Sequence, residues 1–196
     1  MDTISNLLKF FHVLGFVFMS TPLFNLIVVN ERALLGHSFD YNVDRYMENI
    51  IRRGASRCFV FQFTVLISGV LLLIFGPLGV ESLWNNWIIL VKMIILITLT
   101  GLLSYVHFNL QPRIESLMSK IGPGDSVPGG FAAQLKPFRA RRKKLATFCL
   151  FFVITAIILG LQVFGTFSPA LNIALIGAVG LFVWKASRTL IRFGWI

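Results

Sequence analysis

The chain has 196 residues, of which 56% are hydrophobic and 13% are charged, and its mean hydropathy is +0.80. This composition excludes a soluble globular domain and indicates a small protein with several membrane-spanning helices. The net charge of +10 is not taken as a sign of nucleic-acid binding, because the basic residues flank apolar segments and no nucleic-acid motif accompanies them.

Apolar segments follow one another along the whole chain. A helix needs about 20 predominantly apolar residues to cross the hydrocarbon core of a bilayer. The fifth segment is the shortest, so a topology with four spans remains an alternative. The chain is predicted to be all-α, a single integral membrane domain over residues 1–196. Its expected spans are residues 4–29, 58–76, 83–110, 145–164 and 169–184.

The basic residues predict how the bundle is oriented in the membrane. They gather in the loops 30–57 and 111–144 and after the fifth segment, whereas the turns 77–82 and 165–168 contain none. Because cytoplasmic loops are enriched in Lys and Arg, the N-terminus is expected outside and the C-terminus in the cytoplasm. The character of the sequence favours a bacterial inner membrane protein.

The two long loops have distinct patterns. Apolar residues recur at helical spacing over 41–57, which predicts an amphipathic helix that lies on the membrane surface or extends the second span. A turn-rich stretch, 122–130, precedes the basic run FRARRKK at 138–144. This run is expected either to signal topology only or to bind anionic lipid headgroups.

Two polar residues inside apolar segments are the main functional candidates. Lys92 is the one full charge in the stretch 83–110, where insertion costs roughly 2.5–3.5 kcal/mol, and His12 interrupts the first segment. Each lies about 12–14 Å from the outer end of its helix, so both are expected at the same depth. His107 lies about 22 Å further inward, so one haem bridging His12 and His107 is not expected.

A neutral imidazole in an apolar helix is a common haem ligand. Gly15 shares a face with His12 and is expected to leave room for a flat macrocycle, while Met19 is a weaker candidate ligand. Lys92 would ligate iron if deprotonated or pair with a propionate if charged. The alternatives are that His12 is a helix-packing contact and that Lys92 extends to the outer headgroups.

A second polar stripe is predicted in the inner half of the third span. Its spacing of 4, 3 and 4 residues places its members on one helix face. The stripe either lines a path for a quinone, a substrate or protons, or consists of helix-packing hydrogen bonds. Its members are Thr100, Ser104, His107 and Gln111. The two cysteines, Cys58 and Cys149, form no C-x-x-C motif, which excludes a disulfide framework, a thiolate zinc site and covalently attached haem.

The run LLKFFHVLGFVF at 7–18, followed by WIILVKMIILI at 87–97, resembles the pattern of HemJ-type protoporphyrinogen oxidases and CopD-like integral membrane proteins. The resemblance covers roughly the first 115 residues. It implies that His12 is an axial ligand of haem b and that Lys92 binds a substrate or a propionate. The activity it implies is that of a membrane oxidoreductase, in electron transfer or porphyrin oxidation.

Two other function classes remain open. The first is a non-catalytic subunit that packs against a larger membrane complex or against further copies of itself, with polar residues serving only to join helices. The second is a small copper or solute transporter, which the absence of Met-x-x-Met, of an inverted repeat and of carboxylates inside the spans disfavours.

Overall fold

A computed structural model of the chain describes residues 2–34, 39–125, 128–163, 165 and 167–188. It is 86% helical, and the described residues include no strand. Five of its helices are long and apolar enough to cross a membrane, the last one included, which confirms the all-α, five-span prediction. The helices are α1 (Asp2–Leu34), α2 (Tyr41–Phe75), α3 (Ser82–Asn85), α4 (Trp87–Tyr105), the π-helical η1 (Val106–Leu110), α5 (Gln111–Met118), α6 (Phe131–Leu161) and α7 (Pro169–Arg188).

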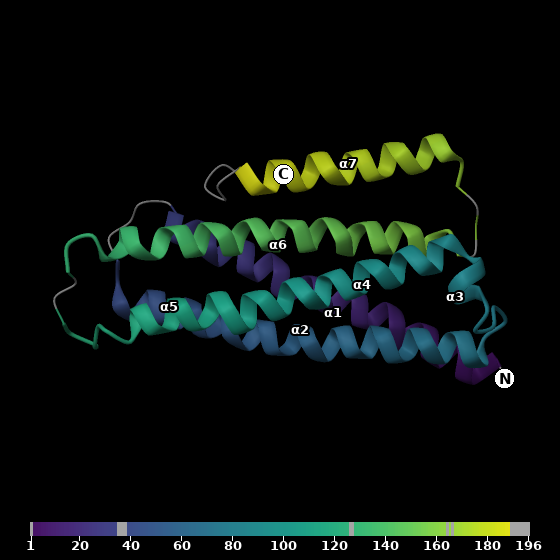
Figure 1. Cartoon of the computed structure of the whole chain (residues 1–196), viewed down its shortest axis with the longest axis horizontal. Coiled ribbons are helices and arrows are strands. Elements are labelled where there is room, and N and C mark those ends of the chain that lie inside the picture. Colours follow the sequence, from purple (N-terminus) through teal and green to yellow (C-terminus); the bar gives the residue numbers. More distant parts are fainter. Residues whose placement is uncertain (1, 35–38, 126–127, 164, 166, 189–196) are drawn as a thin grey trace.

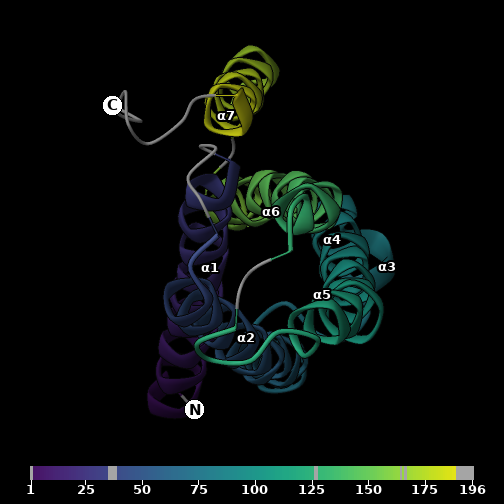
Figure 2. The same cartoon turned by 90° about the vertical axis from the view of Figure 1, so that its left-hand side faces the viewer.

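The long helices run side by side along one axis, and the connections between them alternate between the two ends of the bundle (Figure 1). Viewed along that axis, α1, α2, α4–α5 and α6 surround the centre, and α7 lies outside them against α6 (Figure 2). The most extensive helix contact is between α1 and α2, and α1 also packs against α6. The loops predicted to be cytoplasmic share one end, which is called the basic end below. The side of the membrane that this end faces stays a prediction.

Two of the helices, α2 and α4, begin at a side-chain cap. Asp40 accepts a hydrogen bond from the backbone N–H of Val43 at 3.1 Å and so caps α2. Asn86 accepts one from the N–H of Ile88 at 3.0 Å and separates the short α3 from α4. The predicted span 83–110 is therefore not one helix: its long helix starts at Trp87, because the amide of Asn86 competes for the backbone there.

Two helices are longer at the basic end than the apolar segments indicate. α2 is continuous from Tyr41, so the amphipathic stretch 41–57 extends the second span rather than forming a separate helix. α6 starts at Phe131, directly after Gly130 with φ of 86°, and therefore includes the whole basic run before residue 145. Glycine adopts this left-handed conformation at no steric cost, which lets the chain turn into the helix.

The bundle core is packed from side chains of all four central helices. Met19 from α1, Leu99 from α4 and Val153 from α6 are each exposed by 2% or less. Gly15 lets α1 and α2 approach closely, since a Cβ at this position would lie 2.7 Å from Val65 Cγ2. Small residues at such contacts favour helix association in membranes, where dispersion contacts replace the hydrophobic effect.

Candidate functional site

His12 is held at the contact between α1 and α2. Its Nδ1 lies 3.0 Å from the hydroxyl oxygen of Ser68, and that hydroxyl donates its own proton to the carbonyl oxygen of Thr64. With its proton on Thr64, the Ser68 oxygen is placed to accept a hydrogen bond from His12 Nδ1–H, and in that tautomer Nε2 of the neutral ring carries no proton. This is the tautomer in which a histidine ligates a metal through Nε2.

Lys92 extends from α4 toward the end of α6. Its ammonium group lies 6.0 Å from the centre of the Phe16 ring, and a Cβ built at Gly160 would be 3.4 Å from Nζ. Gly160 belongs to the last turn of α6, the end at which the helix dipole places a partial negative charge. An aromatic face and a helix C-terminus are both groups that attract a cation.

His12 and Lys92 lie at one level of the bundle, as their spacing from the helix ends predicts. The Phe16 ring packs edge-on against the His12 ring, with centroids 5.4 Å apart, and it is also the ring beneath Lys92. Among the ion pairs of the described residues, none involves Lys92. We call His12, Phe16, Ser68 and Lys92 the His–Lys site.

Gly15 and Met19 do not join the His–Lys site. The space beside Gly15 is filled by Val65 and by the backbone of Phe61, so this glycine serves helix packing and leaves no room for a macrocycle. Met19 is fully buried and lines a cavity in the middle of the bundle. It lies two turns along α1 from His12, about 10 Å away along the axis, so the two cannot ligate one iron.

The predicted polar stripe on the third span is not one continuous path. The π-helix η1 inserts a wider turn and shifts the residues that follow it to another face. Thr100 donates to its own helix at Leu96, and the His107 ring packs edge-on between Phe59 and Phe108. Ser104 is half-buried, and Gln111 is buried in contact with charged side chains of other helices.

A buried ion network near the basic end was not foreseen from the sequence. Arg142, which is 0% exposed, donates to both carboxylate oxygens of Glu48, at 2.6 and 2.9 Å, and to Gln111 at 2.7 Å. Arg139 donates to Glu48 at 3.0 Å and to Asp44 at 2.8 Å. The sequence does contain the signal: two acids four apart in the stretch 41–57 and two arginines three apart in the basic run share faces of their helices.

This network changes the expectation for the basic run. Arg139, Arg142 and Lys143 are buried, so they do not face lipid headgroups. Arg141 remains exposed and stacks on the Tyr105 ring at 5.3 Å, and Lys144 is exposed as well. Only part of the run is therefore placed to bind anionic lipids, and that binding stays a prediction.

No family model, curated protein or solved structure matches the chain. The resemblance to the HemJ-type and CopD-like proteins therefore remains an expectation that comes from the runs at 7–18 and 87–97. Within the described residues, no group of three or more His, Cys, Asp or Glu side chains is placed to hold a metal ion. A metal or a cofactor would have to bind through fewer side chains of these types, or through other donors.

Proposed function

We propose that the chain is a membrane-embedded redox protein that binds b-type haem at the His–Lys site. The observation that supports this is the 3.0 Å contact between His12 Nδ1 and the Ser68 hydroxyl, whose oxygen is placed to accept the Nδ1 proton and so to leave Nε2 with its lone pair. Histidine ligands of metals commonly donate their other ring N–H to a neighbouring acceptor, which orients the ring and raises its basicity.

The donors present fit one axial position and one anionic substituent. His12 supplies the axial nitrogen, and Lys92, which has no acidic partner among the described residues, is placed to pair with a propionate. Gly15 is not part of this site because α2 fills its space, and Met19 is too far along α1 to be the second ligand. Bound haem would supply one-electron transfer or the oxidation of a porphyrin. His12, Ser68 and Lys92 would bind and orient it.

The test is a reduced-minus-oxidised visible spectrum of the purified protein, with a pyridine haemochrome assay for stoichiometry. We expect about one haem per chain, its loss in His12→Ala, and roughly 10–100-fold weaker binding in Ser68→Ala, which frees the tautomer. His107→Ala is the matched control, because that ring packs against Phe59 and Phe108 and lies about 22 Å along the span from Lys92. Full haem occupancy in His12→Ala, or a featureless spectrum from protein made with ample haem, would refute the proposal.

A second candidate function is that of an accessory subunit in a larger membrane complex. It is favoured by α7, which packs mainly on α6 and leaves most of its apolar side chains exposed, with Ile173 75% and Leu181 69% exposed. Such a face fits another helix as well as it fits lipid. Partners that co-purify in mild detergent and are lost when Ile173 and Leu181 are both replaced by Trp would support this function, and stable behaviour as a lone monomer would count against it.

The chain would act in the inner membrane of a bacterium, with the basic end in the cytoplasm. The basic residues at that end and the absence of Lys and Arg from the turns 77–82 and 165–168 support this orientation. Anionic headgroups would then be within reach of the exposed Arg141 and Lys144.

A further inference from the structure

Helices α6 and α7 lie side by side and run in opposite directions (Figure 1). The side chains of Gln162 and Asn172 exchange hydrogen bonds at the ends that lie away from the basic end. Closer to the basic end, a Cβ built at Gly180 would lie 4.0 Å from Cε2 of Phe151. These contacts fix the register of the two helices, which places the start of the predicted span 145–164 beside the last turn of α7.

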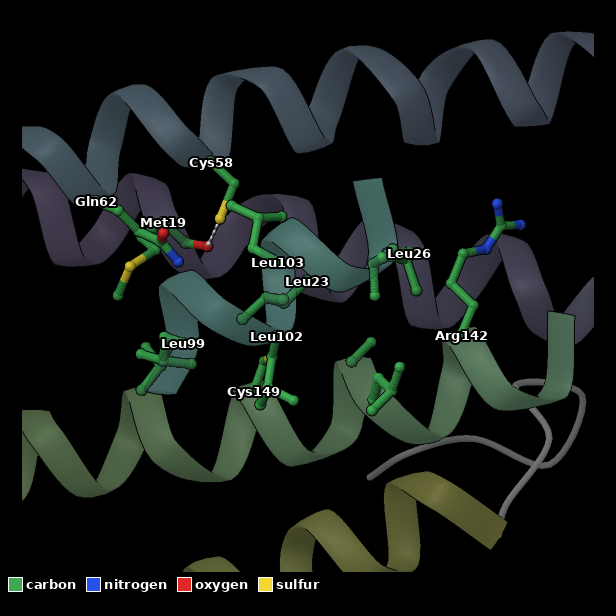
Figure 3. Close-up of a pocket in the computed structure, with 14 residues that line it drawn as sticks. Met19, Leu23, Leu26, Cys58, Gln62, Leu99, Leu102, Leu103, Arg142 and Cys149 are labelled. Carbon is green, nitrogen blue, oxygen red and sulfur yellow. Dashed lines mark hydrogen bonds between the residues drawn. The ribbon is translucent and has the colours of Figure 1, made fainter. Parts of the chain in front are cut away.

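Lys144 lies on the side of α6 that faces α7. It precedes Phe151 by about two helical turns, so the two share a face, and it lies about 10 Å closer to the basic end. The same distance along α7 leads from the Phe151 contact to the last turn, which carries Lys185 and Arg188. Arg142 points the other way: in Figure 3 it projects from α6 into the cavity that it lines, whereas α7 (yellow) lies on the opposite side of α6. We call Lys144, Lys185 and Arg188 the seam cluster.

The seam cluster consists of cations without acidic neighbours on their own helices. All three side chains are exposed, and none takes part in an ion pair of the described residues. The sequence contains no Asp or Glu after Asp125, so neither α6 nor α7 supplies a carboxylate. This differs from the buried ion network, where the arginines of α6 meet acids of α2. The counter-ions of the seam cluster therefore come from outside the two helices.

The seam cluster lies where the headgroups of one leaflet begin. Lys144 and Lys185 directly flank the predicted spans of their helices. Trp184, which is 55% exposed, lies beneath Arg188, whose guanidinium carbon is 4.7 Å from the ring centre. Tryptophan is enriched at this level of a bilayer. Stacking occupies the face of the guanidinium, so its N–H groups, which lie in the plane of the group, keep their capacity to bind a phosphate.

We propose that the seam cluster binds the headgroup of an anionic phospholipid with two phosphates, whose acyl chains cover the outer face of α7. Basic sites between membrane helices at the cytoplasmic side bind such headgroups, and a single phosphodiester would leave most of the positive charge uncompensated. The acyl chains lie against Leu181 and Ile173, which are 69% and 75% exposed. From Trp184 to Ile173 the helix covers about 16 Å, close to the ~15 Å depth of one leaflet.

The inference rests on the proposed placement of the basic end at the membrane surface, and on neither haem nor His12. It also commits to one occupant of the outer face of α7. A partner helix would cover Leu181 and Ile173 equally well, but it gives no reason for three cations at the end of that face. A lipid accounts for both features, because its phosphates match the seam cluster and its chains match the apolar side chains.

The test is native mass spectrometry of the full-length protein in detergent, titrated with cardiolipin, phosphatidylglycerol or phosphatidylethanolamine. We expect the first cardiolipin to bind most tightly and phosphatidylethanolamine, which has no net charge, most weakly. Each cation at a membrane surface contributes roughly fivefold to anionic lipid binding, so Lys144→Gln/Arg188→Gln should weaken cardiolipin binding roughly 25-fold. The matched control is Arg53→Gln/Arg57→Gln, which should leave it nearly unchanged. Both arginines are exposed at the basic end, but they lie on α2, across the bundle from α7 (Figure 2).

Equal affinities for the three lipids, or equal losses in the two double variants, would overturn the proposal. It would also be overturned by a protein partner that is retained in Lys144→Gln/Arg188→Gln and lost when Ile173 and Leu181 are both replaced by Trp, because a helix would then occupy the outer face of α7. Haem content is measured in the same samples and should be equal in the wild type and both double variants. Failure of the lipid site and failure of the haem site are therefore seen separately.

Discussion

Replacing Arg142 with methionine removes the centre of the buried ion network and leaves most of the side-chain volume in place. Arg142 makes three hydrogen bonds to Glu48 and Gln111 and is 0% exposed. Breaking a buried ion pair by removing one partner costs about 3–5 kcal/mol, because the other charge is left without compensation. Glu48 keeps Arg139 at 3.0 Å, so the expected cost lies at the lower end, about 3 kcal/mol.

The assay is unfolding of the purified protein in mild detergent, followed by circular dichroism on heating and by titration with SDS. A loss of 3 kcal/mol corresponds to a fall in Tm of about 6–12 °C for a chain of this length. The neighbouring Arg141→Met is the matched control: Arg141 is exposed, and its stacking on Tyr105 is worth only about 0.5–1 kcal/mol. Equal effects of the two substitutions would refute the argument that burial makes Arg142 different.

The same reasoning gives a stricter test with two substitutions. Adding Glu48→Gln to Arg142→Met removes the uncompensated carboxylate, so the double variant should be less destabilised than the sum of the two single variants. For residues in direct contact, the difference is expected to be about 0.5–3 kcal/mol. Additive effects would mean that Glu48 and Arg142 do not interact in the membrane-embedded protein.

Two further predictions concern packing and orientation. Gly15→Leu should destabilise the bundle by about 1–3 kcal/mol in the same unfolding assay, because even its Cβ would lie 2.7 Å from Val65 Cγ2. Gly101→Ala should be neutral or stabilising by up to about 1 kcal/mol, since a Cβ there meets nothing within 4 Å and alanine favours helices. A larger loss of stability in Gly101→Ala than in Gly15→Leu would contradict the packing argument. The orientation is tested with single cysteines in a variant whose Cys58 and Cys149 are replaced by serine. A cysteine in place of Glu81 should react with an impermeant thiol reagent only from outside, and one in place of Asp125 only from the cytoplasmic side. The two positions lie in connections at opposite ends of the bundle. Labelling of both from one side would exclude five spans.

The apolar pattern predicts the number of crossings well, because a membrane helix is recognised by length and hydropathy alone. It predicts helix ends at the basic end poorly. The basic run before residue 145 is helical because Arg139 and Arg142 meet acids of α2, and this is tertiary information that a scan along one segment does not contain. The start of α4 follows from the Asn86 cap, a local signal hidden inside an apolar stretch.

Residue spacing also predicts the depth of His12 and Lys92, since the rise of a helix is constant. It does not reveal their neighbours: Ser68 and Gly160 lie on helices whose position around the bundle the sequence leaves open. The prediction of one polar stripe along the third span is wrong for a different reason. Its spacing assumes a regular α-helix, and the π-helical turn at Val106–Leu110 breaks that assumption between Ser104 and Gln111.

Buried charges at the basic end have partners within the protein, whereas Lys92 near the other end has no acidic partner among the described residues. This contrast supports the proposal that a ligand binds at the His–Lys site. At the basic end Glu48 is surrounded by Arg139, Arg142 and Gln111, so its charge is compensated within the protein. At the other end the described residues place only an aromatic ring and a helix terminus beside Lys92. A half-buried cation in a membrane protein normally has an anionic partner. Because the described residues supply none, the proposed function places an anionic ligand beside Lys92, with Nε2 of His12 as its second point of attachment.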